Sequence, residues 1–407
     1  MPNSVVLFSE PLLSTDFTQY TVVGPLARRL TADFEVSVVA PSFGPEVAAA
    51  LTDAGVLPIG LGARFPPIRS SRDEIPSFMG SWGRDALRQA NARATEASLR
   101  GTDALRVNFS MTNSARSDIW YVQGRPLAPS LRSVLPNLGG AVGLAARGLA
   151  PAVGLVDGRH FRRMASRAGR LYTACRSLAA WYGRRGLTID GQVPTFLPHP
   201  FEPTTAAPRR DYVLVYLGKE TDMAAVRDLI ATGIPLRLFG GKSGSYVRHR
   251  LGGTPPPHVE SLGFVSHDAL ADLYSHALFT AFPFTEEPFG LVPVESMACG
   301  TPVLTYRAQG PGETVLDGIT GWLVPGRKEF VLAARRIADR GYPAGVAAAC
   351  RRQAARFQLE TVARRWTEIF RAHLEDREPS APAAAPALPL GEFDRGAVVA
   401  PNRQLSR

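Results

Sequence analysis

Short apolar segments alternate with helical patterns along this chain of 407 residues, and the alternation begins twice. The first series opens with an apolar strand at Val5–Phe8, a helix at Val22–Leu30 and a second strand at Glu35–Val39. The second series opens at Tyr212, after a stretch rich in proline. A strand, a helix and another strand in this order form a parallel unit. We therefore expect an α/β protein of two doubly wound, Rossmann-like domains with a cleft between them.

Breaks in this alternation predict the domain boundaries. The run of Pro198, Pro200, Pro203 and Pro208 is typical of an interdomain linker. We expect a first domain over residues 1–202, a second over 203–352, a helical segment over 353–376 and a disordered tail rich in Pro, Ala and Ser over 377–407. Further strands are predicted at Val107–Phe109, Ile119–Val122, Leu171–Tyr172, Pro194–Leu197, Tyr212–Leu217, Leu236–Phe239, Leu278–Phe282 and Val303–Tyr306, and further helices at Met223–Ala231, Ser266–Ser275 and Val292–Cys299.

The composition is that of a globular protein, with 45% hydrophobic and 20% charged residues. The sequence has no run of about 18 apolar residues and no charged segment followed by an apolar one at its start, so neither a spanning helix nor a secretory signal is expected. Cys175, Cys299 and Cys350 are widely spaced, and we interpret them as reduced, structural thiols. These features predict a cytoplasmic protein.

The formal net charge of +10 is concentrated in one segment. Residues 125–186 contain eleven arginines and a single acid, Asp157, which gives a local balance of +10. The same segment carries the apolar stretch Ala141–Val156, and a basic surface beside an apolar one suits a membrane interface or an anionic, lipid-linked acceptor. The alternative is a solvated, arginine-rich helix pair. Peripheral contact with the inner face of the membrane is therefore a candidate property, whereas nucleic acid is not an expected partner.

The stretch Ala281–Val303 carries the most chemical information. An apolar strand ends there, two acids follow, and a helix is expected to begin near Gly290. The amides of Phe289, Gly290 and Leu291 would then lie at a helix start, where they are uncharged donors for a phosphate or sugar oxygen. This is the pattern of a ligand site at the end of a strand.

Two glutamates in this stretch are candidate ligand-binding residues. Glu287 precedes the predicted helix, and Glu295 follows eight residues later. Carboxylates accept hydrogen bonds from hydroxyls, so this spacing suits a nucleotide sugar, with Glu287 at the transferred sugar and Glu295 at the ribose diol. The alternative is that the helix dipole alone favours acids at this position.

The whole stretch resembles the E-x7-E signature of glycosyltransferase family 4, a family of retaining enzymes with the GT-B fold; here it runs Glu287-PFGLVPV-Glu295. The resemblance implies two facing Rossmann-like domains, with a nucleotide-sugar donor bound by the second, a hydroxyl acceptor bound mainly by the first, and no metal or other cofactor. It implies a hexosyltransferase whose acceptor is a glycolipid, a polysaccharide or a small glycoside. It also implies that the last helix crosses back to the first domain. Segments similar to the family's pattern are Ser296–Val303, Gly310–Pro325, Val193–Pro203 and Ala355–Trp366.

The sequence differs from that family at the positions whose side chains bind the donor diphosphate. Gly218 is followed by Lys219, where family members usually carry arginine, and Ala224 stands where they carry a lysine. The resemblance assigns Lys219 to stabilising the departing diphosphate together with the amides of residues 289–291. Lys242 or Arg227 is a candidate to replace the missing cation.

The first domain offers only isolated candidates. Polar residues at predicted strand ends are acceptor-binding candidates, although each is also an ordinary loop residue; they are Asp16, Thr18, Gln19, Asn108 and Gln123. No spacing of His, Cys and carboxylates predicts a metal site.

Three other functions compete with glycosyl transfer. A sugar-nucleotide epimerase or a phosphorylase would share the double Rossmann scaffold but use other site residues. A degenerate enzyme core would leave an anionic-surface or membrane-binding module. An NAD enzyme is disfavoured because no G-x-G-x-x-G follows the first strand of either series.

Overall fold

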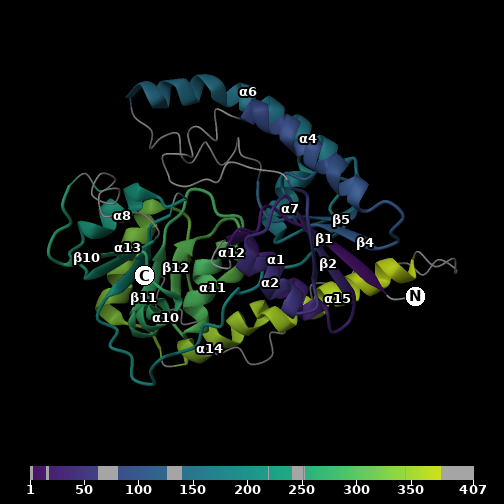
Figure 1. Ribbon diagram of the computed structural model, residues 1–407. Helices are drawn as coiled ribbons and strands as arrows, with labels where there is room; N and C mark the ends of the chain where they lie inside the picture. The colour runs from purple at the N-terminus through teal and green to yellow at the C-terminus, as the bar shows by residue number, and fades with distance from the viewer. Residues whose placement is uncertain are drawn as a thin grey trace. The chain divides into compact units, whose positions relative to one another are not determined.

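The computed structural model describes residues 3–14, 18–62, 81–125, 140–218, 220–240, 251, 253–343 and 345–376. These residues form two compact units. Unit 1 comprises Met1–Pro198 and the late helix α15 (Leu359–Glu375), and unit 2 comprises His199–Gln358. Each unit contains one sheet with helices packed on it (Figure 1).

Unit 1 is built on a seven-stranded sheet of order β3-β2-β1-β4-β5-β6-β7. Every pairing in it is parallel, with Leu7 of β1 opposite Val38 of β2 and Val107 of β4. Its strands are β1 (Ser4–Phe8), β2 (Glu35–Ala40), β3 (Leu57–Gly60), β4 (Leu105–Asn108), β5 (Ser117–Val122), β6 (Ala168–Thr173) and β7 (Gly191–Gln192). Its helices besides α15 are α1 (Thr18–Leu30), α2 (Pro45–Asp53), α4 (Ser81–Ser98), α6 (Gly140–Ala165) and α7 (Arg176–Gly183).

Unit 2 is built on a six-stranded parallel sheet of order β10-β9-β8-β11-β12-β13. Its strands are β8 (Val213–Tyr216), β9 (Leu236–Phe239), β10 (Val259–Gly263), β11 (Phe279–Phe282), β12 (Val303–Tyr306) and β13 (Gly321–Val324). Its helices are α8 (Met223–Ile230), α10 (His267–His276), α11 (Leu291–Ala298), α12 (Pro311–Thr314), α13 (Arg327–Arg340) and α14 (Val346–Ala354).

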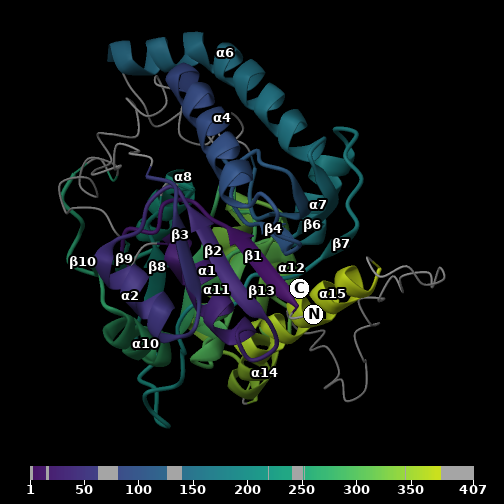
Figure 2. The same ribbon diagram turned by 45° about the vertical axis from the view of Figure 1, so that its right-hand side comes forward.

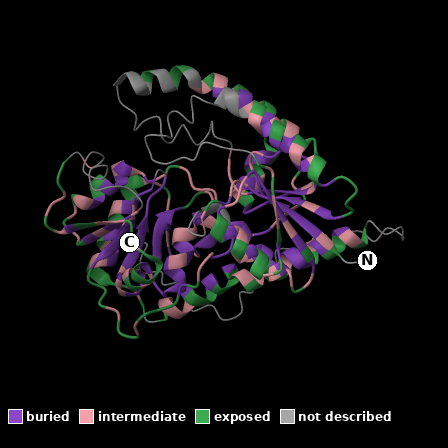
Figure 3. Cartoon of the chain, viewed as in Figure 1, coloured by how far each residue is buried: buried purple, intermediate pink, exposed green. Residues whose placement is uncertain are grey.

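The core of each unit lies around its central strands. Parallel sheets are covered by helices on both faces, so their strands are continuous apolar runs. Val213, Leu214 and Val215 of β8 are fully buried, as are Val5 and Leu7 of β1. Figure 3 shows the strands of both sheets buried and the outer faces of the helices exposed. These strands confirm the predicted α/β fold with two Rossmann-like domains.

One predicted strand is wrong. Pro194–Leu197 is not a strand, because the ladder of unit 1 ends with β7 at Gln192. The amide of Val193 still donates to the carbonyl of Thr173 at 2.9 Å, but Pro194 has no amide with which to continue the ladder. The edge strands β3, β10 and β13 were not predicted. The expected disordered tail, 377–407, lies outside the described residues.

The helix α15 completes unit 1 from a distant part of the chain. Val362, Trp366 and Phe370 follow one another at intervals of four, so they share one face of the helix, and all three are buried. The Trp366 ring lies 5.3 Å from that of Phe109 and 5.1 Å from that of Tyr121, measured between centroids. A late segment therefore supplies part of the core of the N-terminal sheet.

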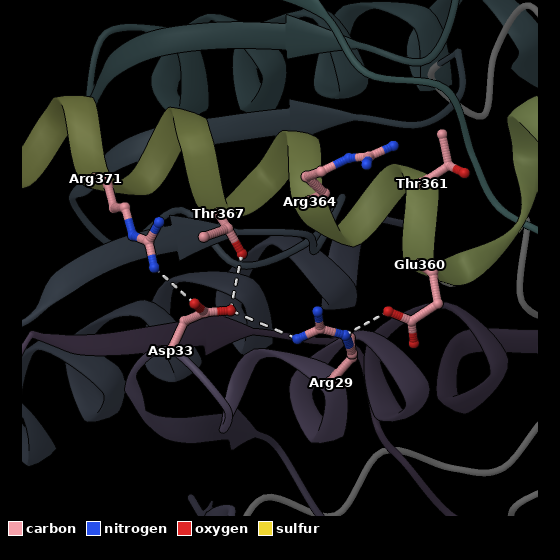
Figure 4. Close-up of a pocket in the computed structure, with 7 residues that line it drawn as sticks. All are labelled: Arg29, Asp33, Glu360, Thr361, Arg364, Thr367 and Arg371. Atoms are coloured by element: carbon pink, nitrogen blue, oxygen red, sulfur yellow. Dashed lines mark hydrogen bonds and ion pairs between the residues drawn. The ribbon is translucent and has the colours of Figure 1, made fainter.

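An ion-pair network reinforces this packing at the surface (Figure 4). The Asp33 carboxylate, after α1, accepts from Arg371 of α15 at 2.6 Å and from Arg29 of α1 at 3.5 Å. Arg29 also donates to Glu360 of α15 at 2.6 Å. The network surrounds a shallow cavity of about 440 Å³ between α1 and α15. It links the two helices by charge as well as by apolar contact.

Helices α4 and α6 pack side by side and extend from the sheet of unit 1, as both views show (Figures 1 and 2). Between them lies a buried ion pair, Arg88–Asp157, with 3.6 Å between the charged groups and side chains only 8% and 3% exposed. Leu144 and Leu155 of α6 are 72% and 50% exposed. No helix among the described residues has the length and apolar character needed to cross a membrane.

The basic segment is partly neutralised by acids from elsewhere in the chain. Arg163 pairs with Asp85 of α4, and Arg167 pairs with Glu96 of the same helix. Arg170 pairs with Asp376, which follows α15. Residues 126–139 of the segment lie outside the described residues, so the predicted basic and apolar surface is seen only on α6 and its surroundings.

Candidate functional site

The candidate site of unit 2 lies at the carboxyl edge of its sheet. The strand order changes direction between β8 and β11, which is where ligands bind in open α/β sheets. The loops that leave these two strands are tied together. The amide of Thr285 donates to the carbonyl of Glu220 at 2.7 Å, and the amide of Asp222 donates to the carbonyl of Pro283 at 3.0 Å. The sequence-predicted residues Gly218, Glu287 and Glu295 belong to these loops and the helix that follows.

Glu287 organises the loop before α11. Its Oε1 accepts from the amide of Gly290 at 2.9 Å and from the amide of Phe289 at 3.2 Å. Its own amide donates to Oε1 of Gln309 at 2.8 Å, and its carbonyl accepts from the amide of Gly310 at 3.3 Å. The carboxylate therefore serves as an acceptor for the turn that leads into the helix.

This arrangement changes the expectation for the amides at the start of α11. Phe289 and Gly290 were predicted to donate to a ligand, but in this structure both donate to Glu287. A phosphate or sugar oxygen at these amides has to displace the carboxylate. The amide of Leu291 belongs to the first residue of the helix, so it has no partner four residues earlier.

Glycines allow the loops around Glu287 to pack closely. Gly290 has φ 90°, in the left-handed region, and a Cβ there would lie 2.9 Å from Cγ of Pro311. A Cβ on Gly310 would lie 2.3 Å from Cα of Phe289, so only glycine fits against this backbone. Gln309 is itself in the left-handed region with φ 51°, which is rare for a residue with a side chain. The loop after β12 is thus shaped to hold the loop of Glu287.

Glu295 lies in the second turn of α11 and is half-buried. Its Oε2 accepts from the hydroxyl of Tyr274, a fully buried residue of α10, at 2.9 Å. Burial raises the pKa of Glu295 to about 7, and the Tyr274 hydroxyl opposes this effect only in part. No described residue donates to Oε1, which leaves that oxygen to accept from a ligand.

Tyr216 connects the acidic groups of the site. Burial is the main cause of the raised pKa of Tyr216, and the charges of Glu220, Glu287 and Glu295 raise it further. A Cβ on Gly218 would lie 2.4 Å from the Tyr216 ring and 2.5 Å from Oε1 of Glu220. Gly218 is therefore required by close packing at the carboxyl end of β8. An anionic ligand in this acidic surrounding needs a nearby cation.

Of the three cations predicted to bind the diphosphate, only Arg227 belongs to the described residues. Lys219 and Lys242 lie outside the described residues. Arg227 is exposed in the last turn of α8, and Ala224 is in the first turn of that helix. The start of α8 is instead capped by Asp222, whose Oδ1 accepts from the amides of Ala224 and Ala225 at 3.1 and 3.2 Å. The described residues contain no cluster of His, Cys, Asp and Glu that would hold a metal ion.

Unit 1 has a polar cluster at its own switch point, between β1 and β4. Glu10 follows β1, and its Oε1 accepts from the hydroxyl of Ser110 at 2.8 Å and from the amide of Met111 at 2.9 Å. Its Oε2 accepts from the hydroxyl of Thr112 at 2.6 Å. His160 of α6 approaches the carbonyl of Met111 at 3.1 Å, and burial lowers its pKa to about 4. The cluster joins two strand-end loops and the base of α6.

Two of the acceptor candidates from the sequence, Asn108 and Gln123, lie at this edge among the described residues. Asn108 is buried and shapes its own loop, because its side chain donates to the carbonyl of Asn113 and accepts from the amide of Ser110. The Gln123 side chain has a buried Nε2 with no partner among the described residues. Thr18 and Gln19 begin α1, but their side chains are not described, and Asp16 lies outside the described residues.

Sequence reasoning missed Glu10 and Glu220, although the signal was present. Glu10 is the first acid after the strand that opens the chain, and Glu220 is the first acid after Gly218. Both occupy the carboxyl end of a central parallel strand, which is where site residues are expected. The dependence of the Ser110–Thr112 loop on Glu10 involves residues a hundred positions apart, and no local pattern contains it.

Comparison with known sequences matches residues 229–341 to the family described as "Glycosyl transferases group 1". Curated relatives include the D-inositol 3-phosphate glycosyltransferases of Nocardiopsis dassonvillei, 39% identical over 110 residues, and of Rhodococcus jostii, 36% identical over 188 residues. These matches cover 26% and 40% of this chain. The chain spans only 26% and 40% of the length of these two relatives.

Solved structures share the fold over nearly the whole chain. Sucrose-phosphate synthase from Thermosynechococcus elongatus has a TM-score of 0.64 and 18% identity, over 92% of this chain and 100% of its own. Anabaena HepE in complex with UDP has a TM-score of 0.61 and 16% identity, over 90% of this chain and 100% of its own. WaaG, a glycosyltransferase involved in lipopolysaccharide biosynthesis, has a TM-score of 0.60 and 15% identity, over 90% of this chain and 99% of its own. The chain therefore shares with these structures the GT-B fold of two Rossmann-like domains.

Proposed function

We propose that this chain is a retaining glycosyltransferase that moves a hexosyl group from a nucleotide sugar to an acceptor hydroxyl. The observation that carries the proposal is the position of Glu287 and Glu295 at the switch point of unit 2, within the segment that matches the group 1 glycosyl transferases. Two carboxylates at different depths of one ligand site suit two sets of hydroxyls, those of a sugar and those of a ribose.

Each residue of the donor site has a separate proposed role. Oε1 of Glu295 accepts from the ribose diol, while Tyr274 holds the other oxygen. Glu287 exchanges its bonds with the amides of Phe289 and Gly290 for bonds with the hydroxyls of the transferred sugar. The freed amides and Lys219 then stabilise the departing diphosphate, without a metal ion. Stabilisation of the leaving group supplies most of the catalysis.

The acceptor is proposed to bind at the carboxyl edge of unit 1. Glu10 and Thr112, which are both half-buried, place a carboxylate and a hydroxyl oxygen at the switch point, where a sugar or cyclitol hydroxyl would find acceptors. Gln123 contributes an amide whose Nε2 has no partner among the described residues. The names of the curated relatives make a phosphorylated cyclitol one acceptor to test beside glycolipids, polysaccharides and small glycosides.

Peripheral membrane contact is a second candidate property. It is supported by Leu144 and Leu155, which are exposed on α6 within the arginine-rich segment. A helix with exposed leucines and basic residues binds anionic vesicles more strongly than neutral ones. Co-sedimentation with vesicles of phosphatidylglycerol and of phosphatidylcholine tests this property, and equal recovery with both would contradict it.

The donor site is tested by a thermal-shift screen of UDP-, GDP-, ADP- and TDP-sugars, with EDTA present. A ligand of the native state at about 100 times its Kd stabilises it by about 2.7 kcal/mol. We expect one nucleotide series to raise the Tm of the wild type and to leave Glu295→Ala unchanged. UDP-sugars are the first candidates, because the structures of HepE include complexes with UDP and UDP-glucose.

The matched control is Glu329→Ala, which removes a glutamate from the exposed start of α13 in the same unit. It should respond to the donor like the wild type. A screen in which no nucleotide sugar shifts the wild type would argue against the proposed donor site. A shift that is equal in Glu295→Ala would place the nucleotide elsewhere.

A further inference from the structure

A cavity of about 530 Å³ lies in unit 2 at the edge of the sheet opposite the donor site. Arg210, Ala277 and Thr301 line it, and each stands shortly before the first residue of a parallel strand, β8, β11 or β12. The donor site lies beyond the last residues of β8 and β11. Because the strands are parallel, the cavity and the donor site occupy opposite ends of the same strands. Its volume is in the range of small-molecule sites.

The charge of the cavity is positive. Arg210 and Arg351 line it, and none of the lining residues is an acid. Arg210 stands over the ring of Tyr342, with 4.8 Å from its guanidinium carbon to the ring centroid. Arg351, on α14, forms no ion pair with any residue in the described part of unit 2. By contrast, the neighbouring Arg209 pairs with Asp211.

The backbone at Arg210 is held in an unusual conformation. Its φ is 57°, in the left-handed region, which costs a residue with a side chain about 1 kcal/mol or more. Its amide donates to the carbonyl of His276 at 2.9 Å, which anchors the strained residue to the end of α10. The guanidinium of this residue lies over the ring of Tyr342 at the cavity wall. Strained residues of this kind concentrate at ligand sites.

A neutral donor completes the wall. The hydroxyl oxygen of Thr205 accepts from the amide of Ala207 at 3.1 Å, so its proton remains for another acceptor. Two guanidinium groups and a hydroxyl donor, with no carboxylate among the lining residues, form a surrounding that suits a dianion. Guanidinium groups match phosphate oxygens in geometry as well as in charge.

We propose that this cavity is a binding site for a small phosphorylated metabolite, held by Arg210 and Arg351. The phosphate group bridges the two guanidinium groups, and the organic part of the metabolite occupies the remaining volume between the segment 203–210 and α14. Binding places an anion of complementary geometry beside two guanidinium groups that form no ion pair with a described residue.

The site is connected to Glu295 through Tyr274. Thr301 lines the cavity, and its hydroxyl donates to the carbonyl of Tyr274 at 2.6 Å. Ser275, the next residue, is also in the wall, and the hydroxyl of Tyr274 holds Glu295. Helix α11 provides a second connection, because it carries Glu295 and ends at Cys299 in the wall. An occupant therefore regulates donor affinity; this regulation rests on the proposed function, whereas the phosphate site does not.

The site is tested by titration calorimetry of the full chain with inorganic phosphate at constant ionic strength. Arg210→Asn removes the guanidinium and introduces a residue that tolerates the left-handed region, and Arg351→Gln removes the charge and introduces a residue with a similar helix propensity. Each should weaken phosphate binding by about tenfold, because each removes a charge-assisted contact. The matched control is Arg209→Gln, which should bind phosphate like the wild type.

Two results would overturn the site. One is a wild type that binds no phosphate. The other is phosphate affinity that persists in both Arg210→Asn and Arg351→Gln, since the anion would then bind elsewhere, for example at the donor diphosphate site. Thermal unfolding of the apo variants shows whether a lost signal comes from a lost fold.

The regulation is tested with the nucleotide sugar found in the thermal-shift screen. Phosphate should change the Kd of that donor in the wild type and leave it unchanged in Arg351→Gln. If the protein binds phosphate but phosphate does not change the donor Kd, the proposed regulation is wrong and the proposed phosphate site is still supported. A protein that binds phosphate but no nucleotide sugar would count against the proposed function alone.

Discussion

Replacement of Glu295 by glutamine should make unit 2 more stable at high pH and leave it unchanged at low pH. Partial burial of the Glu295 carboxyl group raises its pKa from the ordinary 4.5 to about 7. Between these two values the native protein binds a proton that the unfolded chain has released. The free energy of unfolding therefore falls as the pH rises through this window, and the penalty is complete above about pH 7.

The magnitude follows from the size of the shift. Each pKa unit corresponds to about 1.4 kcal/mol, so a shift from 4.5 to about 7 costs up to about 3 kcal/mol at pH 8. Glutamine has the same shape and no charge, and its carbonyl still accepts from the hydroxyl of Tyr274. For a unit of 160 residues, this gain corresponds to a rise in Tm of roughly 6–12 °C at pH 8.

The measurement is scanning calorimetry of the wild type and Glu295→Gln between pH 4 and pH 8.5. The two Tm values should agree at pH 4, below the ordinary pKa of a glutamate, and diverge as the pH rises. Glu329→Gln is the control, because it removes the same charge from an exposed position of α13. A difference between wild type and Glu295→Gln that is constant over the whole pH range would refute the reasoning. A Glu295→Gln protein that is less stable than the wild type at pH 8 would refute it as well.

Three further predictions concern other carboxylates. Glu287→Ala leaves the amides of residues 289 and 290 without their acceptor, so unfolding assays should show a loss of about 1–3 kcal/mol and turnover assays no transfer; Glu287→Gln should recover most of the stability but not the transfer. Glu10→Ala removes the acceptor of three donors in unit 1 and should cost about 1–3 kcal/mol and raise the acceptor KM, whereas an unchanged KM would separate this cluster from the acceptor site. Asp33→Asn should cost about 1 kcal/mol in low salt, and equal losses at 0.05 M and 1 M NaCl would contradict an ionic contribution.

The central strands were predictable from the sequence because the pattern that identifies them is contained in a few adjacent residues. β9 and β12 have the predicted bounds, since a buried parallel strand is a short apolar run between polar loops. The edge strand β10 lacks this signal. β10 reads VESLG and exposes Glu260 and Ser261, so its strand character comes from pairing with β9 rather than from its composition.

The donor site was predictable in its location but not in its bonding. The order of strand, acids and helix placed Glu287 and Glu295 at the carboxyl edge of the sheet. The pattern did not reveal that Glu287 accepts from the loop amides, because this bond depends on the left-handed Gly290. Tyr274 and Glu295 lie on two different helices and are 21 residues apart in the sequence. Their contact therefore arises only from tertiary packing.

The dependence of unit 1 on α15 has a consequence for the order of events during synthesis. Between Pro198 and Leu359 the ribosome adds the 160 residues of unit 2, which takes roughly 8–32 s at 5–20 residues per second. Throughout that interval the rings of Phe109 and Tyr121 lack the cover of Trp366. The N-terminal sheet of the nascent chain is therefore expected to expose an aromatic surface until the last helix is made. A chaperone that binds apolar surface has its longest opportunity to engage the chain in this period.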